Sequence, residues 1–141
     1  MIITKSILDN IKNENVVLPD NTLLNLPEKV LQFGTGVLLR GLPDYFIDKA
    51  NRKGLFNGRI VVVKSTSKGD LNDFRDQDNL YTICVRGIEN GTSVEENIIS
   101  SAISRVLSAE SDWKAILEVA RSPSVQLFIS NTTEVGIALV R

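Results

Sequence analysis

Two glycines separated by one residue follow a short apolar run in the first third of the chain. Val30–Phe33 leads into Gly34, Thr35 and Gly36, and a segment with a helical pattern comes next. Glycine allows the backbone to approach a phosphate closely, and free N–H groups at a helix start face the anion. The match to G-x-G-x-x-G is incomplete, because Leu39 stands at the third glycine position. The spacing therefore predicts either a pyrophosphate-binding turn or a plain tight turn.

Polar and charged residues stand close to this turn and at the ends of two later apolar runs. Arg40 could add a charge-assisted contact to a phosphate or to a substrate oxygen, although a solvated surface arginine explains it equally well. Lys64 and Ser65 follow one run, and the polar segment 130–134 follows the last one. Ligands of open parallel sheets bind beyond the carboxyl ends of the strands, so we expect one shared site.

The nature of these strand ends suggests what each could bind. Lys64 stands where a dinucleotide fold usually carries an acidic residue for the ribose hydroxyls, which favours NADP. A lysine that reaches solvent is the alternative. The segment 130–134 suits hydrogen bonds to a ribose or a nicotinamide, and a helix cap at Thr133 is the alternative there.

The glycine turn needs a strand before it and a helix after it, and the pattern supplies both. Lys29–Phe33 is the first expected strand, and residues 1–28 form a lead-in with a short helix. Pro43 predicts the start of the next helix and Gly54 its end. We expect the helix to lie on the sheet through one apolar stripe: Leu42, Phe46, Ile47 and Ala50. Arg59–Lys64 then predicts a buried parallel strand, which completes a βαβ unit.

The second half of the chain predicts an antiparallel hairpin, a helix and another strand. Asn90-Gly91 is a strong hairpin turn signal between two alternating segments, Tyr81–Arg86 and Thr92–Ile99. The next helix is expected to bury Trp113 with Ile116, and Val125–Ser130 is expected to be a buried strand. The predicted fold class is therefore α/β: a Rossmann-like parallel sheet with helices, interrupted by a hairpin insertion.

The composition excludes several classes of function. A net charge of -1 lacks the excess of basic residues typical of nucleic-acid binding. No apolar stretch is long enough for a membrane span. The single Cys84 cannot form an internal disulfide, which favours the cytoplasm, and its alternating neighbours predict a buried structural thiol. Because the chain has no histidine, it has no Ser-His pair and no imidazole for zinc. A cofactor that brings its own chemistry fits such a chain, and no metal is expected.

Three stretches together resemble the N-terminal part of the mannitol dehydrogenase family of polyol-type long-chain dehydrogenases. They are residues 30–40, which contain the glycine turn, then 78–82, and then 130–137. Within this family the chain is most similar to the tagaturonate reductase (altronate oxidoreductase) branch, which interconverts D-tagaturonate and D-altronate. The resemblance implies NAD as the cofactor, against the preference for NADP suggested by Lys64. It also implies a small sugar acid as the substrate of the full protein.

The resemblance places residues in the family's cofactor site. It implies that Gly34, Gly36 and Arg40 belong to the cofactor loop. It likewise implies that Asn131, Thr133 and Glu134 lie on the nicotinamide side. With the strand ends added, the expected cofactor-binding residues are Phe33, Gly34, Thr35, Gly36, Val37, Leu38, Arg40, Lys64, Ser65, Asn131, Thr132, Thr133 and Glu134. We expect no catalytic residue in this chain.

The chain departs from the family pattern in two ways. Val37 and Leu38 stand where the family's loop usually carries Asn-Phe. Family members are also several times longer, and their catalytic lysine lies in a helical C-terminal domain without a counterpart here. We therefore expect residues 29–141 to form an incomplete NAD-binding domain without reductase activity of its own. The alternatives are a fructuronate reductase or mannitol 2-dehydrogenase of the same family, and a non-catalytic nucleotide-binding module. No pattern indicates an oligomeric state.

Overall fold

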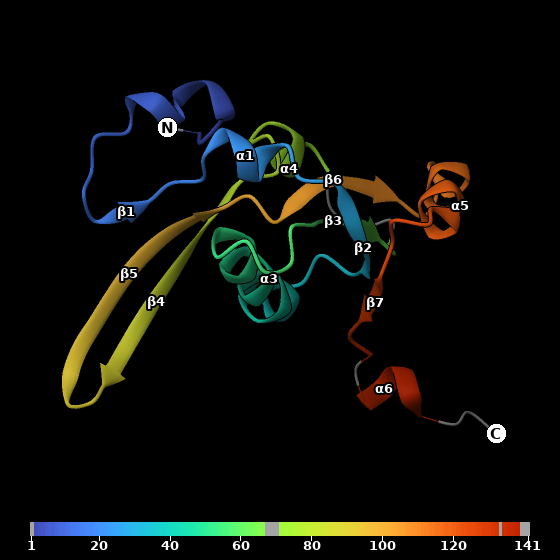
Figure 1. The fold of residues 1–141 in the computed structure, drawn as a ribbon. Coiled ribbons are helices and arrows are strands. Elements are labelled where there is room, and N and C mark those ends of the chain that lie inside the picture. Colours follow the sequence, from blue (N-terminus) through green and yellow to red (C-terminus); the bar gives the residue numbers. More distant parts are fainter. Residues whose placement is uncertain (1, 67–70, 133, 139–141) are drawn as a thin grey trace.

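A four-stranded parallel sheet forms the core of the computed structural model (Figure 1). The structure describes residues 2–66, 71–132 and 134–138. The strands are β2 (Glu28–Phe33), β3 (Arg59–Lys64), β6 (Ile103–Ser108) and β7 (Leu127–Ser130). Their order is β6-β3-β2-β7, and each neighbouring pair is parallel. The chain thus runs outward from β2 through β3 to β6 and then returns to the other side of β2. A parallel sheet with helices between its strands confirms the predicted α/β class.

Two helices cover the two faces of this sheet, because its central strands are apolar on both sides. Helix α3 (Pro43–Arg52) packs Ile47 against one cluster, which alternate strand residues form: Val30, Ile60 and Val62. Helix α5 (Trp113–Arg121) packs Ile116 and Val119 against the intervening residues: Leu31, Val61 and Val63. Burial on both faces is the usual condition of a parallel sheet with helical crossovers.

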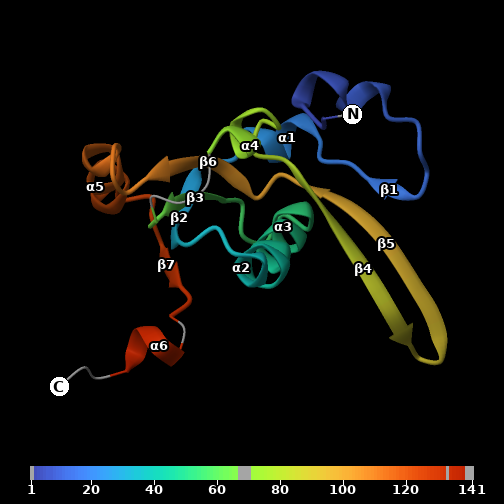
Figure 2. The ribbon, with the colours of Figure 1, turned by 180° about the vertical axis from the view of Figure 1, so that it is seen from behind.

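An antiparallel hairpin extends away from the parallel sheet (Figure 1, Figure 2). Strands β4 (Tyr81–Glu89) and β5 (Thr92–Ser100) pair along their whole length. At the tip, Asn90 has φ +50° and Gly91 has φ +80°. Two consecutive positive φ values suit the tight turns that join twisted strands, so the predicted Asn-Gly hairpin is confirmed. The short strand β1 (Val16–Val17) adds to β5 in parallel.

The lead-in is a packed part of the fold. It contains a 3₁₀-helix, η1 (Lys5–Asn10), and a short helix, α1 (Asn21–Leu24). Leu8 of η1 packs with Leu80 and Ile99 at the base of the hairpin in a third apolar cluster. The segment therefore covers the region where the hairpin joins the rest of the molecule.

Two arginines of the α/β part hold the lead-in by its backbone. Arg52 Nη1 donates to the Leu18 carbonyl at 2.9 Å, and Arg59 Nη1 donates to the Leu24 carbonyl at 2.7 Å. The other guanidinium nitrogens of Arg59 donate to the carbonyls of Ser101 and Ile103. These charge-assisted bonds satisfy buried carbonyls where regular secondary structure is interrupted.

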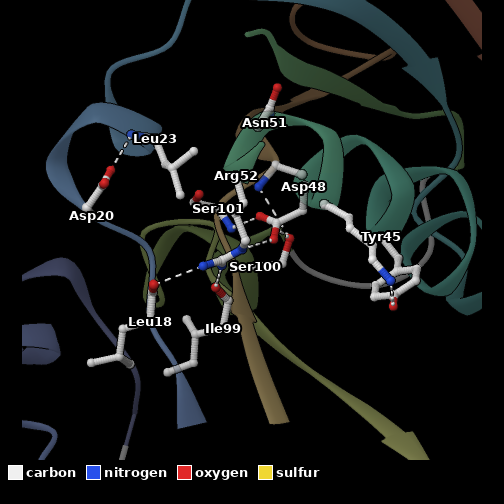
Figure 3. A network of polar contacts seen from close by, with 12 residues as sticks. Leu18, Asp20, Leu23, Tyr45, Asp48, Asn51, Arg52, Ile99, Ser100 and Ser101 are labelled. Atoms are coloured by element: carbon white, nitrogen blue, oxygen red, sulfur yellow. Dashed lines mark hydrogen bonds and ion pairs between the residues drawn. The ribbon is translucent and has the colours of Figure 1, made fainter. Parts of the chain in front are cut away.

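Helix α3 presents a polar face to the interior. Its buried residues recur at helical spacing: Asp44, Asp48 and Asn51. Figure 3 shows the network around Asp48, whose Oδ1 accepts from the Ser101 N–H at 3.0 Å and from the Ser100 hydroxyl at 3.3 Å. Its Oδ2 pairs with Arg52 Nε at 2.6 Å. These partners give a buried carboxylate the hydrogen bonds it needs, and they tie α3 to the β5–β6 connection.

Several expectations about burial are wrong. Leu42 and Phe46 are exposed, because the aspartates of α3 occupy the inward positions. Trp113 is also exposed, because it is the first residue of α5 and lies outside the face that packs on the sheet. Cys84 is exposed on the outer face of β4. Leu127 and Phe128 of the edge strand β7 are exposed as well.

Candidate functional site

The carboxyl ends of the parallel strands bring the three predicted segments to one edge of the sheet. Phe33 of β2 lies opposite Val63 of β3 and Ser130 of β7. The next residues along each strand are Gly34, Lys64 and Asn131. The order of the strands reverses between β2 and β7, and an open α/β sheet binds its ligand outside the strand ends at such a switch point.

Gly34 makes the turn at the end of β2. Its φ is +116°, a conformation that residues with a side chain rarely adopt. Its N–H donates to the Val63 carbonyl at 2.8 Å, which ties the turn to β3. A Cβ at this position would lie 3.0 Å from Leu39 Cδ1. The backbone conformation therefore requires glycine, and a Cβ would in addition force the Leu39 side chain to shift.

Gly36 differs from Gly34 because the fold does not require it. It caps α2 (Val37–Gly41) with φ −65° and ψ 157°, angles that any residue adopts, and a Cβ there would meet nothing within 4 Å. The residue is exposed. Close approach of a ligand is a reason for glycine at a position that the protein itself leaves open.

The turn presents backbone N–H groups without protein acceptors. In the part of the chain that the structure describes, the N–H groups of Thr35 and Gly36 donate to no protein atom. The first turn of α2 adds the N–H groups of Val37 and Leu38, which a helix start leaves unpaired. Successive free N–H groups at a strand–helix turn are the usual means of binding a pyrophosphate.

Arg40 lies between two aromatic rings at the edge of this turn. Its Cζ is 5.6 Å from the centroid of the Phe74 ring and 5.8 Å from that of the Tyr81 ring, within the range of cation–π contacts. The Tyr81 hydroxyl donates to the Arg40 carbonyl at 3.3 Å. Among the described residues, the buried Nε of Arg40 has no hydrogen-bond partner. The side chain is thus held in place by two rings, and its buried Nε is unpaired.

Two cavities border Arg40. One of about 250 Å³ lies between α2 and the first residues of β4, with Val37 and Tyr81 in its lining. The other, of about 360 Å³, is lined by Thr35 of the glycine turn and by Phe74. An anionic group in either cavity would meet the positive charge of Arg40.

Two buried polar side chains join β2 and α3 below the turn. Gln32 and Asp44 are both fully buried. Gln32 Nε2 donates to the Gly34 carbonyl at 3.3 Å and to Asp44 Oδ2 at 3.2 Å. Burial raises the pKa of Asp44 from 3.8 to about 7, while the Gln32 hydrogen bond and the Arg40 charge act in the opposite direction. Burial, with a contribution from Asp44, also raises the pKa of the Tyr81 hydroxyl well above its usual range.

The second strand end carries a lysine that binds its own backbone. Lys64 is only 9% exposed, and its Nζ donates to the Thr66 carbonyl. Ser65 is exposed beside it. The ammonium group is therefore bound inside the loop and does not extend freely into solvent.

The third strand end is only partly described. Asn131 and Thr132 are exposed directly after β7. Thr133 lies outside the described residues, and so does the side chain of Glu134, which begins α6 (Glu134–Ile137). Phe33, at the end of β2, is half-buried and packs in the cluster under α5 rather than at the turn.

Gln32 and Asp44 belong to the site although the motifs did not indicate them, and the sequence carries a signal for each. Gln32 is the single polar residue in the apolar run Val30–Phe33. Asp44 recurs with Asp48 and Asn51 at helical spacing, which marks a polar face as clearly as an apolar stripe would. Phe74 lies in the short helix α4 (Asn72–Arg75), within the polar segment after β3, and has no periodic signal.

Residues 2–66, 71–132 and 134–138 contain neither a metal-ligand cluster nor a membrane-spanning helix. There, no group of three or more His, Cys, Asp or Glu residues is arranged to hold a metal ion. No helix in these ranges combines the length and apolar character needed to cross a membrane.

Comparison with known proteins agrees with the resemblance. No protein-family model matches the chain. Altronate oxidoreductase of Halalkalibacterium halodurans is 43% identical over 113 residues, which are 79% of this chain and 22% of that protein. The altronate oxidoreductases of Bacillus subtilis and Bacteroides thetaiotaomicron are 42% and 37% identical over similar stretches. The chain therefore spans less than a quarter of the length of these relatives.

Solved structures share the fold. Mannitol 2-dehydrogenase of Pseudomonas fluorescens, in a ternary complex with NAD and D-mannitol, matches with a TM-score of 0.80 over 93% of this chain and 26% of that one, at 24% identity. A substrate-free D-sorbitol dehydrogenase matches with a TM-score of 0.78 over 95% of this chain and 27% of that one, at 21% identity. The expected resemblance is thus confirmed: the chain is homologous to a part of the altronate oxidoreductases, and it has the fold of the corresponding part of mannitol and sorbitol dehydrogenases.

Proposed function

We propose that this chain is the NAD-binding part of an oxidoreductase that interconverts D-tagaturonate and D-altronate. The observation that carries the proposal is the set of free N–H groups from Thr35 to Leu38 at the switch point of the sheet. The names of the relatives support altronate as the alcohol, and the mannitol 2-dehydrogenase complex supports NAD as the cofactor.

The residues at the switch point fit a dinucleotide. The backbone N–H groups of the glycine turn would hold the pyrophosphate, and Arg40 would add a positive charge beside it. Gly36 leaves the space that a phosphate needs, since a Cβ there would meet no protein atom within 4 Å. Asn131 and Thr132 would lie on the nicotinamide side. When bound, the cofactor would exchange a hydride with the carbonyl carbon of the sugar acid.

Lys64 supports NAD over NADP. A dinucleotide with a 2′-phosphate needs a free cation near the end of the second strand. The ammonium of Lys64 is bound to the Thr66 carbonyl, and the residue is buried. We therefore propose that Lys64 shapes the loop after β3 and does not serve as a phosphate ligand.

The proton of the reaction would be exchanged by residues outside this chain. The side chains that surround the glycine turn are held by internal contacts: Arg40 by two rings, and Asp44 by Gln32. We expect the 141-residue chain to bind NADH and to leave it unoxidised when D-tagaturonate is added. Oxidation of NADH by the purified chain would contradict this division of roles.

A titration with NADH tests the proposed site, with nicotinamide and Trp113 fluorescence as readouts. We expect saturable binding, and binding roughly tenfold or more weaker in Gly36→Val, because the side chain would occupy the phosphate space. The variant should fold, since Gly36 has a φ of −65° and open surroundings. The matched control is Gly87→Val on the hairpin, where a Cβ also meets nothing within 4 Å. Equal affinity of Gly36→Val and wild type would place the phosphates elsewhere.

A further inference from the structure

We propose that Asp44 and Gln32 form a buried brace that orients the glycine turn for its ligand, with Asp44 as a positioning residue that responds to pH. The proposal rests on the proposed dinucleotide site, and it extends that site to two residues that never touch the ligand. Both side chains are fully buried below the turn.

The first step of the argument concerns the peptide between Gly34 and Thr35. Gln32 Nε2 donates to the Gly34 carbonyl at 3.3 Å, so this carbonyl points into the protein. In a planar trans peptide the C=O and N–H bonds point in opposite directions. The N–H of Thr35 is therefore directed away from Gln32, and it has no protein acceptor among the described residues.

The second step is that this orientation needs support. Glycine has two broad regions of accessible φ, so the peptide after Gly34 could rotate and present its carbonyl oxygen where its N–H now lies. An oxygen in that position would repel a phosphate instead of binding it. The amide of Gln32 holds the carbonyl inward and so keeps the N–H available.

The third step is that Asp44 holds Gln32. Its Oδ2 accepts the second Nε2 hydrogen at 3.2 Å. Because the Gly34 carbonyl is an acceptor, the amide group of Gln32 must present its NH₂ to it, which leaves Gln32 Oε1 toward the interior. Gln32 Oε1 and Asp44 Oδ1 are both buried without a hydrogen-bond partner among the described residues.

A proton on Asp44 Oδ1 would give both unpaired oxygens a hydrogen bond, because a protonated carboxyl both donates and accepts. The carboxyl and the amide could then form a reciprocal pair, with Asp44 donating to Gln32 Oε1 and accepting from Nε2. Burial, which raises the pKa of Asp44 to about 7, puts this protonation near neutral pH. Above that pH Asp44 can no longer donate to Gln32 Oε1, so the reciprocal pair is lost and the amide is held through Nε2 alone, by a charge-assisted hydrogen bond.

The charged surroundings act in the same direction. Arg40 from α2 acts on the charge of Asp44, and the Tyr81 hydroxyl from β4 interacts with both Asp44 and Asp48. Tyr81 stays neutral over the range concerned, and Asp48 is paired with Arg52. Ionisation of Asp44 offsets the charge of Arg40 and adds negative potential below the turn. Affinity for an anionic dinucleotide is therefore expected to fall as the pH rises through about 7.

The first experiment measures the dissociation constant of NADH between about pH 6 and about pH 8 by nicotinamide fluorescence. Wild type should lose affinity across this range. Asp44→Asn keeps a reciprocal amide pair with Gln32, so it should bind NADH with little dependence on pH. Asp44→Ala and Gln32→Met should bind about tenfold more weakly, as expected for one lost hydrogen bond to a buried group.

The matched control is Asp48→Asn, a buried carboxylate on the same helix that has no contact with the turn. It should lower the melting temperature without changing the pH profile of NADH binding. Equal affinity and equal pH profiles in wild type, Asp44→Ala and Gln32→Met would overturn the proposal.

The second experiment needs no cofactor and separates the brace from the proposed function. The amide resonance of Thr35 is followed by NMR as a function of pH. It should titrate with a midpoint near pH 7 in wild type and stay constant in Asp44→Asn and in Gln32→Met. If wild type binds no NADH but Thr35 titrates in this way, the dinucleotide site is wrong and the brace stands. If the pH dependence of the Thr35 resonance is the same in wild type, Asp44→Asn and Gln32→Met, the brace is overturned, whether or not NADH binds.

Discussion

Helices α3 and α5 cover opposite faces of the same sheet, yet they are attached by different chemistry. Helix α5 buries Ile116 and Val119 against the apolar face of β2 and β3. Helix α3 buries Asp44, Asp48 and Asn51, and it contributes Ile47 to the apolar cluster. Apolar contacts tolerate small shifts of a helix, whereas hydrogen bonds require particular distances and angles. The helix whose position is set by hydrogen bonds is α3, which comes after the glycine turn and the short helix α2.

The difference between the helices suggests a division between stability and positioning. The polar face of α3 gains less free energy from burial than an apolar face, because its groups must first be desolvated. In return it fixes the end of β2, the glycine turn and the β5–β6 connection relative to one another. The following predictions test this division, beginning with the largest expected effect.

The stability of the chain should depend on pH through Asp44. Its pKa is raised from 3.8 to about 7 in the folded chain, so between these values the folded chain holds a proton that the unfolded chain releases. The free energy of unfolding should therefore fall by about 4 kcal/mol in total as the pH rises from 3.8 to about 7. Above this range it should no longer change with pH through Asp44. Urea unfolding of wild type and of Asp44→Asn at several pH values measures the difference. A constant difference between the two would show that Asp44 is ionised throughout.

Removal of the Asp48 carboxylate should cost about 3 kcal/mol of unfolding free energy, because Arg52 and the Ser101 N–H would lose a buried partner. Asp48→Ala is the test, and Asp48→Asn is the control, because its amide oxygen can still accept from the Ser101 N–H. The control should lose less free energy of unfolding than Asp48→Ala. If Asp48→Ala unfolds at the same urea concentration as wild type, hydrogen bonds do not hold α3.

A conservative change on α5 should have a smaller effect. Ile116→Val removes one methyl group from a nearly fully buried side chain and should cost about 1 kcal/mol. NADH binding should be unchanged, because α5 lies on the face away from α3 and Asp44. Thermal unfolding and the NADH titration measure the two effects together. A clear loss of NADH affinity in this variant would contradict the division between the helices.

The sequence predicts the α5 side better than the α3 side, for a physical reason. Apolar burial leaves a periodic pattern, so the βαβ unit, the Asn-Gly hairpin and the convergence of the strand ends were predicted. The buried aspartates of α3 depend on partners in other elements, such as Gln32 of β2 for Asp44 and the distant N–H of Ser101 for Asp48. No local pattern reveals such partners. Arg40 was predicted as a site residue, but its contacts with Phe74 and Tyr81 follow from the path of the loop and the hairpin.

The smallest expected effect belongs to the exposed aromatic residues of the two helices. Phe46 of α3 is 57% exposed and Trp113 of α5 is 54% exposed, although the apolar patterns predicted both to be buried. Phe46→Ser and Trp113→Ser should each change the free energy of unfolding by no more than about 0.5 kcal/mol, as at other surface positions. Urea unfolding at neutral pH gives the values. A loss of several kcal/mol in Phe46→Ser alone would mean that α3 is rotated, with its apolar stripe on the sheet. Asp44 could not then reach Gln32, and the brace would have no structural basis.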